Sequence, residues 1–321
     1  MIEEQAGTYS GFTYVGPPPG VHAGARGDAS SLASRPATFI VTYDGFPPEA
    51  QVAFQYATDI WASVVQSSVP IRISAYWRTD MSPYILAGAG ATAVFRDFPN
   101  APRANTYYPV ALANARAGAD LSADDDIRVY FNGNFDWYLG TDGNASTRID
   151  LVTVALHEIG HGLGFSGSMT VNNGIGSWGF GSPAMPVAYD WLIANGAGRL
   201  LLDTAAFPNG SATLGAELVG DDVRFDGPLV RSANSGVAPY VFSPNPWAGG
   251  SSINHLSNWN FPFGGPDRLM TPSMAPGEVI HNPGPVTRAI LANLGWTIET
   301  GSIPQPTTRP SAPSNFRRVV E

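Results

Sequence analysis

The pattern of apolar and polar positions predicts β-strands mainly in the first half of the chain. The clearest candidates are rich in β-branched and aromatic residues, and most of them alternate apolar with polar positions, as half-buried strands do. They cover residues 37–43, 71–77 and 126–132. Residues 91–97 and 105–112 are two further candidates, and Pro109 would confine the second of these to the edge of a sheet.

A helical spacing of apolar residues predicts three longer helices and one short one. The longer ones cover residues 46–68, 148–165 and 285–296, and the short one covers residues 187–196. In the first helix, the residues expected to share a buried face are Ala53, Tyr56, Ile60 and Val64. For residues 204–282 we expect loops with short strands. The order strand, helix, strands, helix in the first half is typical of an α/β (α+β) layer.

Composition and charge narrow the class of protein. The chain has 321 residues, of which only 13% are charged, and its 36 glycines and 28 prolines suit a loop-rich globular protein. A net charge of −9 without any basic run argues against nucleic acid as a partner. The longest apolar runs are too short to span a membrane. The absence of cysteine excludes disulfides, thiolate catalysis and cysteine-based zinc sites.

Residues 154–167, VALHEIGHGLGFSG, contain the strongest chemical signal in the sequence. His157 and His161 are four positions apart, so on a helix both imidazoles lie on one face and can hold one ion. Glu158 lies at the neighbouring angle, where it can reach a water bound to that ion and take its proton. Gly164 is suited to a left-handed residue that ends the helix. This H-E-x-x-H pattern on a helix is typical of zinc proteases.

A catalytic zinc usually has three protein ligands, so a third side chain must come from elsewhere in the chain. Gly167 stands where one class of zinc proteases places its third histidine. The first glutamate after the motif is Glu217, in a glycine-rich stretch, which disfavours a glutamate ligand. His22 lies in an irregular arm, where we expect a solvated side chain. The candidates that remain are His255, His281 and Asp190.

Two segments together resemble the leishmanolysin-like metzincin zinc proteases. The first is HEIGHGLGFSG, and the second, after a long insertion, is HLSNWNFPFGGPDRLMTP at residues 255–272. In that family a histidine distant from the motif completes the zinc site, and a methionine-containing turn lies beneath the metal. The resemblance implies one catalytic Zn²⁺ bound by His157, His161 and His255. Glu158 is then the catalytic base and Met270 forms the turn.

The resemblance also implies a division of the chain. It predicts a twisted mixed sheet with two helices in an upper subdomain, and an irregular lower subdomain with a C-terminal helix. The expected subdomains are the upper catalytic one with the motif helix (37–167) and the lower one with the third histidine and the methionine turn (168–301). Composition alone indicates an N-terminal arm (1–36) and a linker or tail (302–321), after which another domain could follow. The chain departs from some metzincins at Pro272, where they place a tyrosine.

The sequence therefore predicts a zinc-dependent endopeptidase whose substrate is a protein or peptide. Residues 1–12 lack the apolar core of a signal peptide, and we expect a secreted or cell-surface monomer whose signal peptide has been removed. The alternative is a non-catalytic surface adhesin or glycan-binding module on a protease-like scaffold, suggested by eight tryptophans and by Asn- and Gly-rich stretches. The intact Glu158 favours the enzyme, because a binding module has no need of it.

Two weaker signals concern the substrate and a second metal. TYYPV, residues 106–110, is similar to a cleft-edge strand of serralysin-like relatives, so Tyr107 and Tyr108 could line a strand to which substrate pairs. An ordinary edge strand explains this pattern equally well. The acidic stretches 124–126 and 141–144 could bind Ca²⁺ through carboxylates and carbonyls, although turns and a solvated charge run also explain them.

Overall fold

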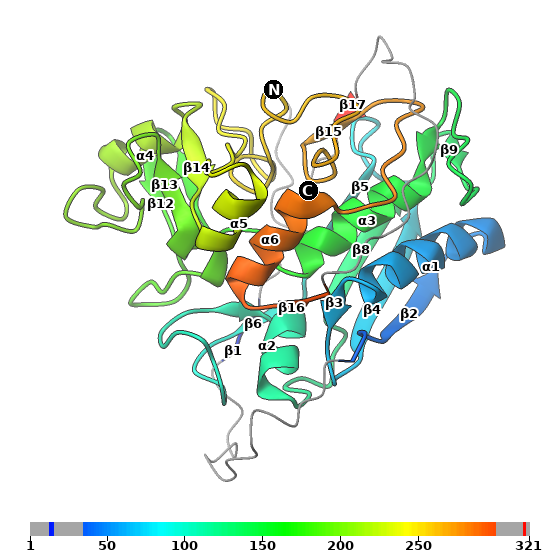
Figure 1. The fold of residues 1–321 in the computed structure, drawn as a ribbon, viewed down its shortest axis with the longest axis horizontal. Coiled ribbons are helices and arrows are strands. Elements are labelled where there is room, and N and C mark those ends of the chain that lie inside the picture. Colours follow the sequence, from blue (N-terminus) through cyan, green and yellow to red (C-terminus); the bar gives the residue numbers. More distant parts are fainter. Residues whose placement is uncertain (1–12, 16–34, 300–316, 319–321) are drawn as a thin grey trace.

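The computed structural model describes residues 13–15, 35–299 and 317–318 (Figure 1). Over these residues the protein has a mixed central sheet and six α-helices, which confirms the α+β class that the sequence predicts. The predicted arm and linker fall almost entirely outside the described residues. None of the helices described is long and apolar enough to cross a membrane.

Four strands in the order β2-β4-β8-β5 form the central sheet. The parallel ones, which match the clearest sequence predictions, are β2 (Phe39–Asp44), β4 (Ile71–Arg78) and β8 (Ile127–Asn132). The fourth, β5 (Ala87–Ala91), pairs antiparallel with β8 and forms one edge. Its sequence, AGAGA, contains no side chain that favours strands, so its conformation is set by its neighbours.

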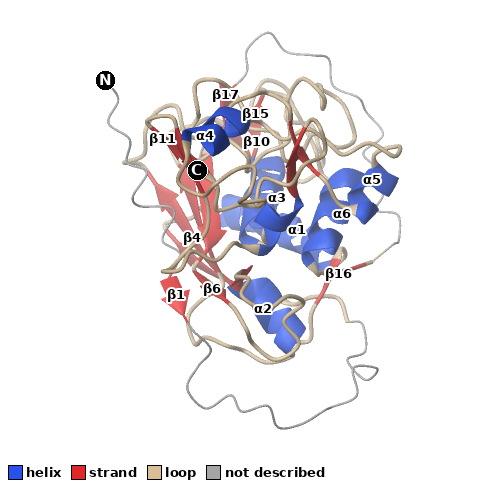
Figure 2. Ribbon diagram, turned by 90° about the vertical axis from the view of Figure 1, so that its left-hand side faces the viewer, coloured by secondary structure: helices blue, strands red, loops and turns tan. Residues whose placement is uncertain are grey.

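Two helices cover one face of this sheet (Figure 2). They are α1 (Pro48–Ala62) and α3 (Leu151–Gly162), and α3 also contacts β5 and β8. The indole N–H of Trp61 in α1 donates a hydrogen bond to the carbonyl of Leu156 in α3 at 2.9 Å. The helix with the H-E-x-x-H motif therefore packs on the sheet and against the neighbouring helix α1.

The helix predicted over residues 46–68 ends early, at Ala62. Of the residues predicted to share its buried face, Tyr56 is an exception and is 38% exposed. The buried face is formed instead by the side chains that pack on the sheet and on α3, among them Phe54, Ala57, Ile60 and Trp61.

The segment predicted as an edge strand at residues 105–112 is a strand only in part, because residues 110–112 already belong to a helix. β7 (Tyr108–Pro109) is a two-residue strand, and α2 (Val110–Ala117) begins directly after it. β7 is an edge strand, as Pro109 predicted. Pro109, with a φ of −57°, ends this strand and also precedes the first residue of α2, so the strand is shorter than predicted. β7 pairs with β6 (Ala93–Phe95), and β6 also pairs with β1 (Thr13–Val15).

Short elements fill the insertion, residues 168–254, between α3 and the third predicted histidine. They are the pair β11 (Thr170–Asn172) and β12 (Ile175–Ser177), the pair β13 (Ile193–Asn195) and β14 (Val223–Phe225), and the helices α4 (Ala212–Leu218) and α5 (Pro228–Ala233). The helix predicted at residues 187–196 is a 3₁₀ helix, Ala188–Leu192, followed by β13. α4 and α5, of seven and six residues, are too short for apolar spacing to predict them.

The predicted C-terminal helix is α6 (Gly284–Leu294), with Pro285 in its first turn and Gly295 after its end. The indole N–H of Trp296 donates to the carbonyl of Leu163 at 2.7 Å and joins this end of the chain to the end of α3. The remaining strands form short pairs, namely β9 (Trp137–Tyr138) with β10 (Ile149–Asp150), β16 (Thr297–Ile298) with β3 (Val65–Gln66), and β15 (Ser273–Met274) with β17 (Arg317–Arg318).

Candidate metal centre

Helix α3 contains the predicted motif, and every one of its residues is buried. It begins after Asp150, whose carboxylate accepts hydrogen bonds from the N–H of Thr153 at 2.8 Å and from its hydroxyl at 2.6 Å. This is the side-chain cap that a helix N-terminus requires. Polar side chains in so buried a helix cost free energy unless they bind a partner, so its two histidines and its glutamate indicate a site.

α3 ends in a glycine-dependent turn directly after the motif. Gly164 has a φ of 114°. The N–H of Phe165 bonds to the carbonyl of Gly160 at 3.1 Å, and the N–H of Gly164 bonds to that of His161 at 2.9 Å. This pair of bonds forms a Schellman motif, in which a residue of positive φ reverses the chain. The reversal brings the Phe165 carbonyl within 2.8 Å of Nδ1 of His161.

Three histidines converge beside the C-terminal half of α3. His157, His161 and His255 are all buried, and their ligand atoms lie within 4.8 Å of one another. Nε2 of His157 is 2.9 Å from Nε2 of His161 and 3.2 Å from Nε2 of His255. In the part of the chain that the structure describes, no other group of three or more His, Cys, Asp or Glu side chains is arranged to hold a metal ion. The three histidines are close enough to bind one.

Backbone pairing brings His255 to α3 from a distant part of the chain. Its carbonyl accepts a hydrogen bond from the N–H of Phe242 at 2.7 Å, and Leu256 donates its N–H to the carbonyl of Met270 at 2.7 Å. The preceding residue, Asn254, accepts a hydrogen bond from the N–H of Gly167 at 2.8 Å. The position of the third histidine is therefore fixed on both sides, by the insertion and by the turn at Met270.

Backbone carbonyls orient all three imidazoles. For His157, His161 and His255, Nδ1 contacts the carbonyl oxygens of Leu269, Phe165 and Ser251 at 2.7, 2.8 and 2.8 Å. Because a carbonyl oxygen can only accept, we assign the proton to each Nδ1 and a lone pair to each Nε2. Lone pairs that face one another at such short range repel, and a cation between them replaces the repulsion with coordination.

The arrangement fits a tetrahedral zinc ion. Ligand atoms at about 2.0–2.1 Å from a tetrahedral ion lie about 3.3 Å from one another, close to the Nε2 separations around His157. Burial lowers the pKa of His157 well below its ordinary value and that of His161 to about 4. Both imidazoles are therefore neutral at neutral pH, as a metal ligand must be. Three nitrogen ligands leave a fourth position for water or substrate.

Glu158 follows His157 in α3 and is fully buried. A helix turns by about 100° per residue, so the Glu158 side chain leaves the helix beside the face that carries the two histidines. A buried carboxyl group costs free energy unless it has a partner, and this one lies next to the first of the three clustered histidines.

Met270 lies in a tight turn beneath α3. The N–H of Thr271 bonds to the carbonyl of Arg268 at 3.1 Å and closes this turn. Met270 is fully buried, and a Cβ atom added to Gly160 would lie only 2.9 Å from its sulfur. The glycine inside the motif thus makes room for the methionine to approach the helix.

The other candidate ligands lie elsewhere. Nε2 of His281 contacts Oδ2 of Asp150 at 2.8 Å, at the N-terminal end of α3. Asp190 accepts hydrogen bonds from the N–H of Ser168 at 2.9 Å and from its hydroxyl at 2.5 Å, and burial raises its pKa to about 6. His22 lies outside the described residues. Neither His281 nor Asp190 belongs to the histidine group.

The predicted substrate strand is not open at Tyr107. Tyr107 and Tyr108 are buried. The N–H of Tyr107 bonds to the carbonyl of Pro186 and its carbonyl accepts from the N–H of Ala188, both at 2.9 Å. Tyr108 pairs with Phe95 of β6. A substrate strand at Tyr107 would have to displace the insertion, so this expectation is not retained.

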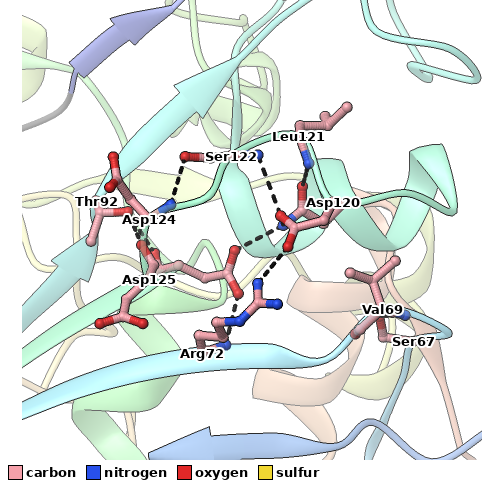
Figure 3. A network of polar contacts seen from close by, with 11 residues as sticks. Ser67, Val69, Arg72, Thr92, Asp120, Leu121, Ser122, Asp124 and Asp125 are labelled. Carbon is pink, nitrogen blue, oxygen red and sulfur yellow. Dashed lines mark hydrogen bonds and ion pairs between the residues drawn. The ribbon is translucent and has the colours of Figure 1, made fainter. Parts of the chain in front are cut away.

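The acidic stretches considered for Ca²⁺ have carboxylates that accept hydrogen bonds from protein groups. Figure 3 shows the ion pair between Asp120 and Arg72 near the first stretch. Asp126 accepts hydrogen bonds from the N–H of Arg72 at 2.7 Å and from the amide of Asn114 at 2.8 Å. Asp142, in the second stretch, accepts from neighbouring side-chain and backbone donors. Among the described residues, neither stretch gathers three acidic groups around one point.

Sequence reasoning does not find the groups that hold the imidazoles in place. These groups are three backbone carbonyls, and every residue has one, so the sequence does not indicate which of them contact the histidines. Sequence reasoning also misses the buried ion pair of Arg268 with Glu278, which lies in the same segment as the turn at Met270. Two opposite charges ten positions apart in a segment otherwise poor in charge are the signal that could have indicated it.

Comparisons with known proteins match part of the chain. Residues 101–175, which include α2, β8 and α3, match a family described as SPBPB7E8-like. Over 62 residues the chain is 39% identical to uncharacterized protein PB7E8.01 of Schizosaccharomyces pombe. This similarity covers 19% of the chain and 11% of the yeast protein, so the chain spans a small part of that relative. No solved structure matches the chain.

Proposed function

We propose that the protein is a zinc-dependent endopeptidase that hydrolyses peptide bonds with a water activated by Glu158. The observation that carries this proposal is the convergence of three buried histidines, each with its Nδ1 against a backbone carbonyl. Structural zinc sites are usually closed by four protein ligands, whereas three ligands and an open position are typical of catalytic sites. The buried carboxyl group of Glu158, adjacent to the first ligand, supports a hydrolytic role.

The chemistry follows from the residues in this site. His157, His161 and His255 would hold the ion through Nε2. When bound, zinc supplies a Lewis acid that lowers the pKa of a water and polarises the carbonyl of the peptide bond. Glu158 accepts the proton of that water during its attack on the carbonyl carbon, and then delivers the proton to the leaving amine. Burial of the whole helix lowers the local dielectric and strengthens these interactions.

The order of elements supports the leishmanolysin-like metzincin type. The motif helix, the turn at Gly164, the distant His255 and the turn at Met270 follow one another as the resemblance implies. We propose the antiparallel edge strand β5, beside α3, as the strand to which an extended peptide substrate pairs. We also propose, as the sequence predicts, that the enzyme is secreted or displayed at the cell surface.

Digestion of casein or gelatin tests the proposal. Wild-type protein should cleave these substrates, a chelator should abolish cleavage, and added Zn²⁺ should restore it. Glu158→Gln should keep the zinc and lose about 10²–10⁴-fold in kcat, the usual contribution of acid–base catalysis. Glu49→Gln, at an exposed position of α1, is the matched control and should cleave at the wild-type rate. Full activity of Glu158→Gln would refute the mechanism.

One observation favours the alternative of a glycan-binding module. Trp259 is 93% exposed, four residues after His255, and an exposed indole offers a flat apolar face on which a sugar ring can stack. A protein that binds zinc, cleaves no protein substrate and loses glycan binding in Trp259→Ala would support this function over the proposed one.

A further inference from the structure

A buried ion pair lies directly behind the turn at Met270. Arg268 and Glu278 are 2% and 3% exposed, and Nε of Arg268 donates a hydrogen bond to Oε1 of Glu278. The second carboxylate oxygen of Glu278 accepts from the N–H of Ala275 at 3.0 Å. Well-packed apolar residues stabilise a fold at least as well as most buried ion pairs do. A pair at this place therefore indicates a role beyond stability.

The guanidinium of Arg268 joins the two chain segments that complete the histidine site. Nη1 donates to the carbonyl of Phe261 at 3.2 Å, in the loop that follows His255. Nη2 donates to the carbonyl of Ser273 at 3.2 Å, just after the turn. Because the guanidinium is planar and rigid, it fixes these acceptors relative to each other. Arg268 thus holds the loop after the third histidine against the turn.

The residue next to Arg268 supplies the carbonyl that orients the first histidine. The Leu269 carbonyl lies 2.7 Å from Nδ1 of His157, and the Met270 carbonyl accepts the N–H of Leu256, the neighbour of His255, at 2.7 Å. A rotation of the backbone at Arg268 would move both acceptors. Loss of such a partner to a ligating histidine typically weakens metal binding 10- to 100-fold.

We infer that Arg268 and Glu278 are positioning residues of the metal site, which hold the Leu269 carbonyl at Nδ1 of His157 and keep the segment of His255 aligned with it. The inference rests on the proposed function for the identity of the ion. Its geometric part concerns the metal-free protein and can be tested without the metal.

A second anchor on the same segment provides a matched control. The N–H of Ile280 donates to the hydroxyl of Thr153 at 2.8 Å, and His281 contacts Asp150 at 2.8 Å. These contacts bind the C-terminal end of the segment 268–281 to the first turn of α3, at the opposite end of the helix from the turn at His161. Loss of His281 should loosen this end without moving the Leu269 carbonyl.

Two variants separate positioning from stability. Glu278→Gln leaves the buried Arg268 without its charge partner and is expected to destabilise the fold. The double variant Arg268→Met with Glu278→Leu removes both charges, so it should fold, but it lacks the bonds to the carbonyls of Phe261 and Ser273. His281→Gln is the control at the other anchor.

The readouts are zinc affinity by competition with a chromophoric chelator, the d–d absorption of the Co²⁺-loaded protein, and the ring ¹⁵N shifts of the metal-free protein. The double variant should bind zinc about 10- to 100-fold more weakly, with a changed Co²⁺ spectrum and a mixture of His157 tautomers. His281→Gln should keep wild-type values in all three. Wild-type zinc affinity and a single His157 tautomer in the double variant would overturn the inference. If wild-type protein binds no zinc, the proposed function fails, while the ¹⁵N shifts still decide the inference.

Discussion

Nε2 of His157 lies 3.2 Å from Nε2 of His255, although 98 positions separate the two residues in the sequence. The contact joins a buried helix to a loop that the chain reaches only after the whole insertion. A carbonyl from the turn at Leu269 orients the first ring, and a carbonyl at Ser251 orients the second. The site can therefore form only when helix, insertion and turn have all folded.

Replacing His255 by alanine should remove the metal. We expect wild-type protein to hold one zinc ion per chain. His255→Ala should bind zinc more than about 100-fold more weakly. Removing only the group that hydrogen-bonds to a ligating histidine already lowers metal affinity about 10- to 100-fold, and removing the ligand itself should lower it further. His281→Ala, which removes the other candidate histidine, should keep the full amount. Metal analysis after dialysis distinguishes the two variants, and zinc retained by His255→Ala would exclude it as the third ligand.

Zinc should stabilise the folded protein against heat. The unfolded chain does not bring the three histidines together, so the ion binds the native state preferentially. At a free concentration 100 times its dissociation constant it should add about 2.7 kcal/mol to the free energy of unfolding. Thermal unfolding with zinc and with chelator measures this difference. If zinc raised the midpoint temperature of unfolding equally in wild type and in His255→Ala, it would be stabilising the protein from a different binding site.

Alanine should be tolerated at Gly160 but not at Gly162. At Gly162 the new methyl group would lie 2.4 Å from Cγ2 of Ile127 in the central strand β8, and such overpacking costs about 1–3 kcal/mol. At Gly160 the nearest atom is the sulfur of Met270 at 2.9 Å. The flexible methionine can move, and a gain in helix propensity of about 1 kcal/mol offsets the strain. Urea unfolding measures the free energy of unfolding of both variants, and the Gly162 variant should lose more of it. Equal losses in the two variants would contradict the prediction.

Asp190 should make stability depend on pH in the acidic range. Burial raises its pKa from an ordinary value of 3.8 to about 6, so the folded protein binds this proton more tightly than the unfolded chain. Its contribution to the free energy of unfolding is therefore largest below pH 3.8 and declines as the pH rises through 6. Asp190→Asn cannot titrate, whereas all other groups are common to both proteins.

The test is the difference in free energy of unfolding between wild type and Asp190→Asn, measured in urea from pH 4 to pH 7. The advantage of wild type should shrink as the pH rises towards 6 and then level off. A difference that grows with pH over this range would mean that hydrogen bonds from Ser168 and Val187 outweigh burial and lower the pKa.

The sequence predicts those elements of the fold in which the spacing of apolar side chains matches the positions that are buried. β4 alternates buried and less buried positions from Ile71 onward, and α3 continues the apolar stripe that precedes the motif. β5 could not be predicted, because alanine and glycine have no preference for strands. Its extended conformation comes from pairing with β8 and from packing against α3. Pro109 does lie in an edge strand, but a proline also suits the residue before a helix, so the pattern could not tell that the strand ends there and α2 begins.

The candidate site divides in the same way. His157 and His161 can be paired from spacing alone, because residues four apart share a helix face. His255 can be chosen only by resemblance, since nothing in the pattern around it says which distant helix it meets. The orienting carbonyl of Leu269 cannot be foreseen, because every residue has one and only the turn decides where it points.

Gly167 and Asn254, at the two ends of the insertion, are joined by one hydrogen bond of 2.8 Å. The chain thus leaves the core just after two of the clustered histidines and returns to the same place with the third. Because the two ends of the insertion lie next to each other, its length can change during evolution while the positions of these ends stay the same. The outer surface of the insertion can therefore change while the few insertion residues that contact His255 stay as they are.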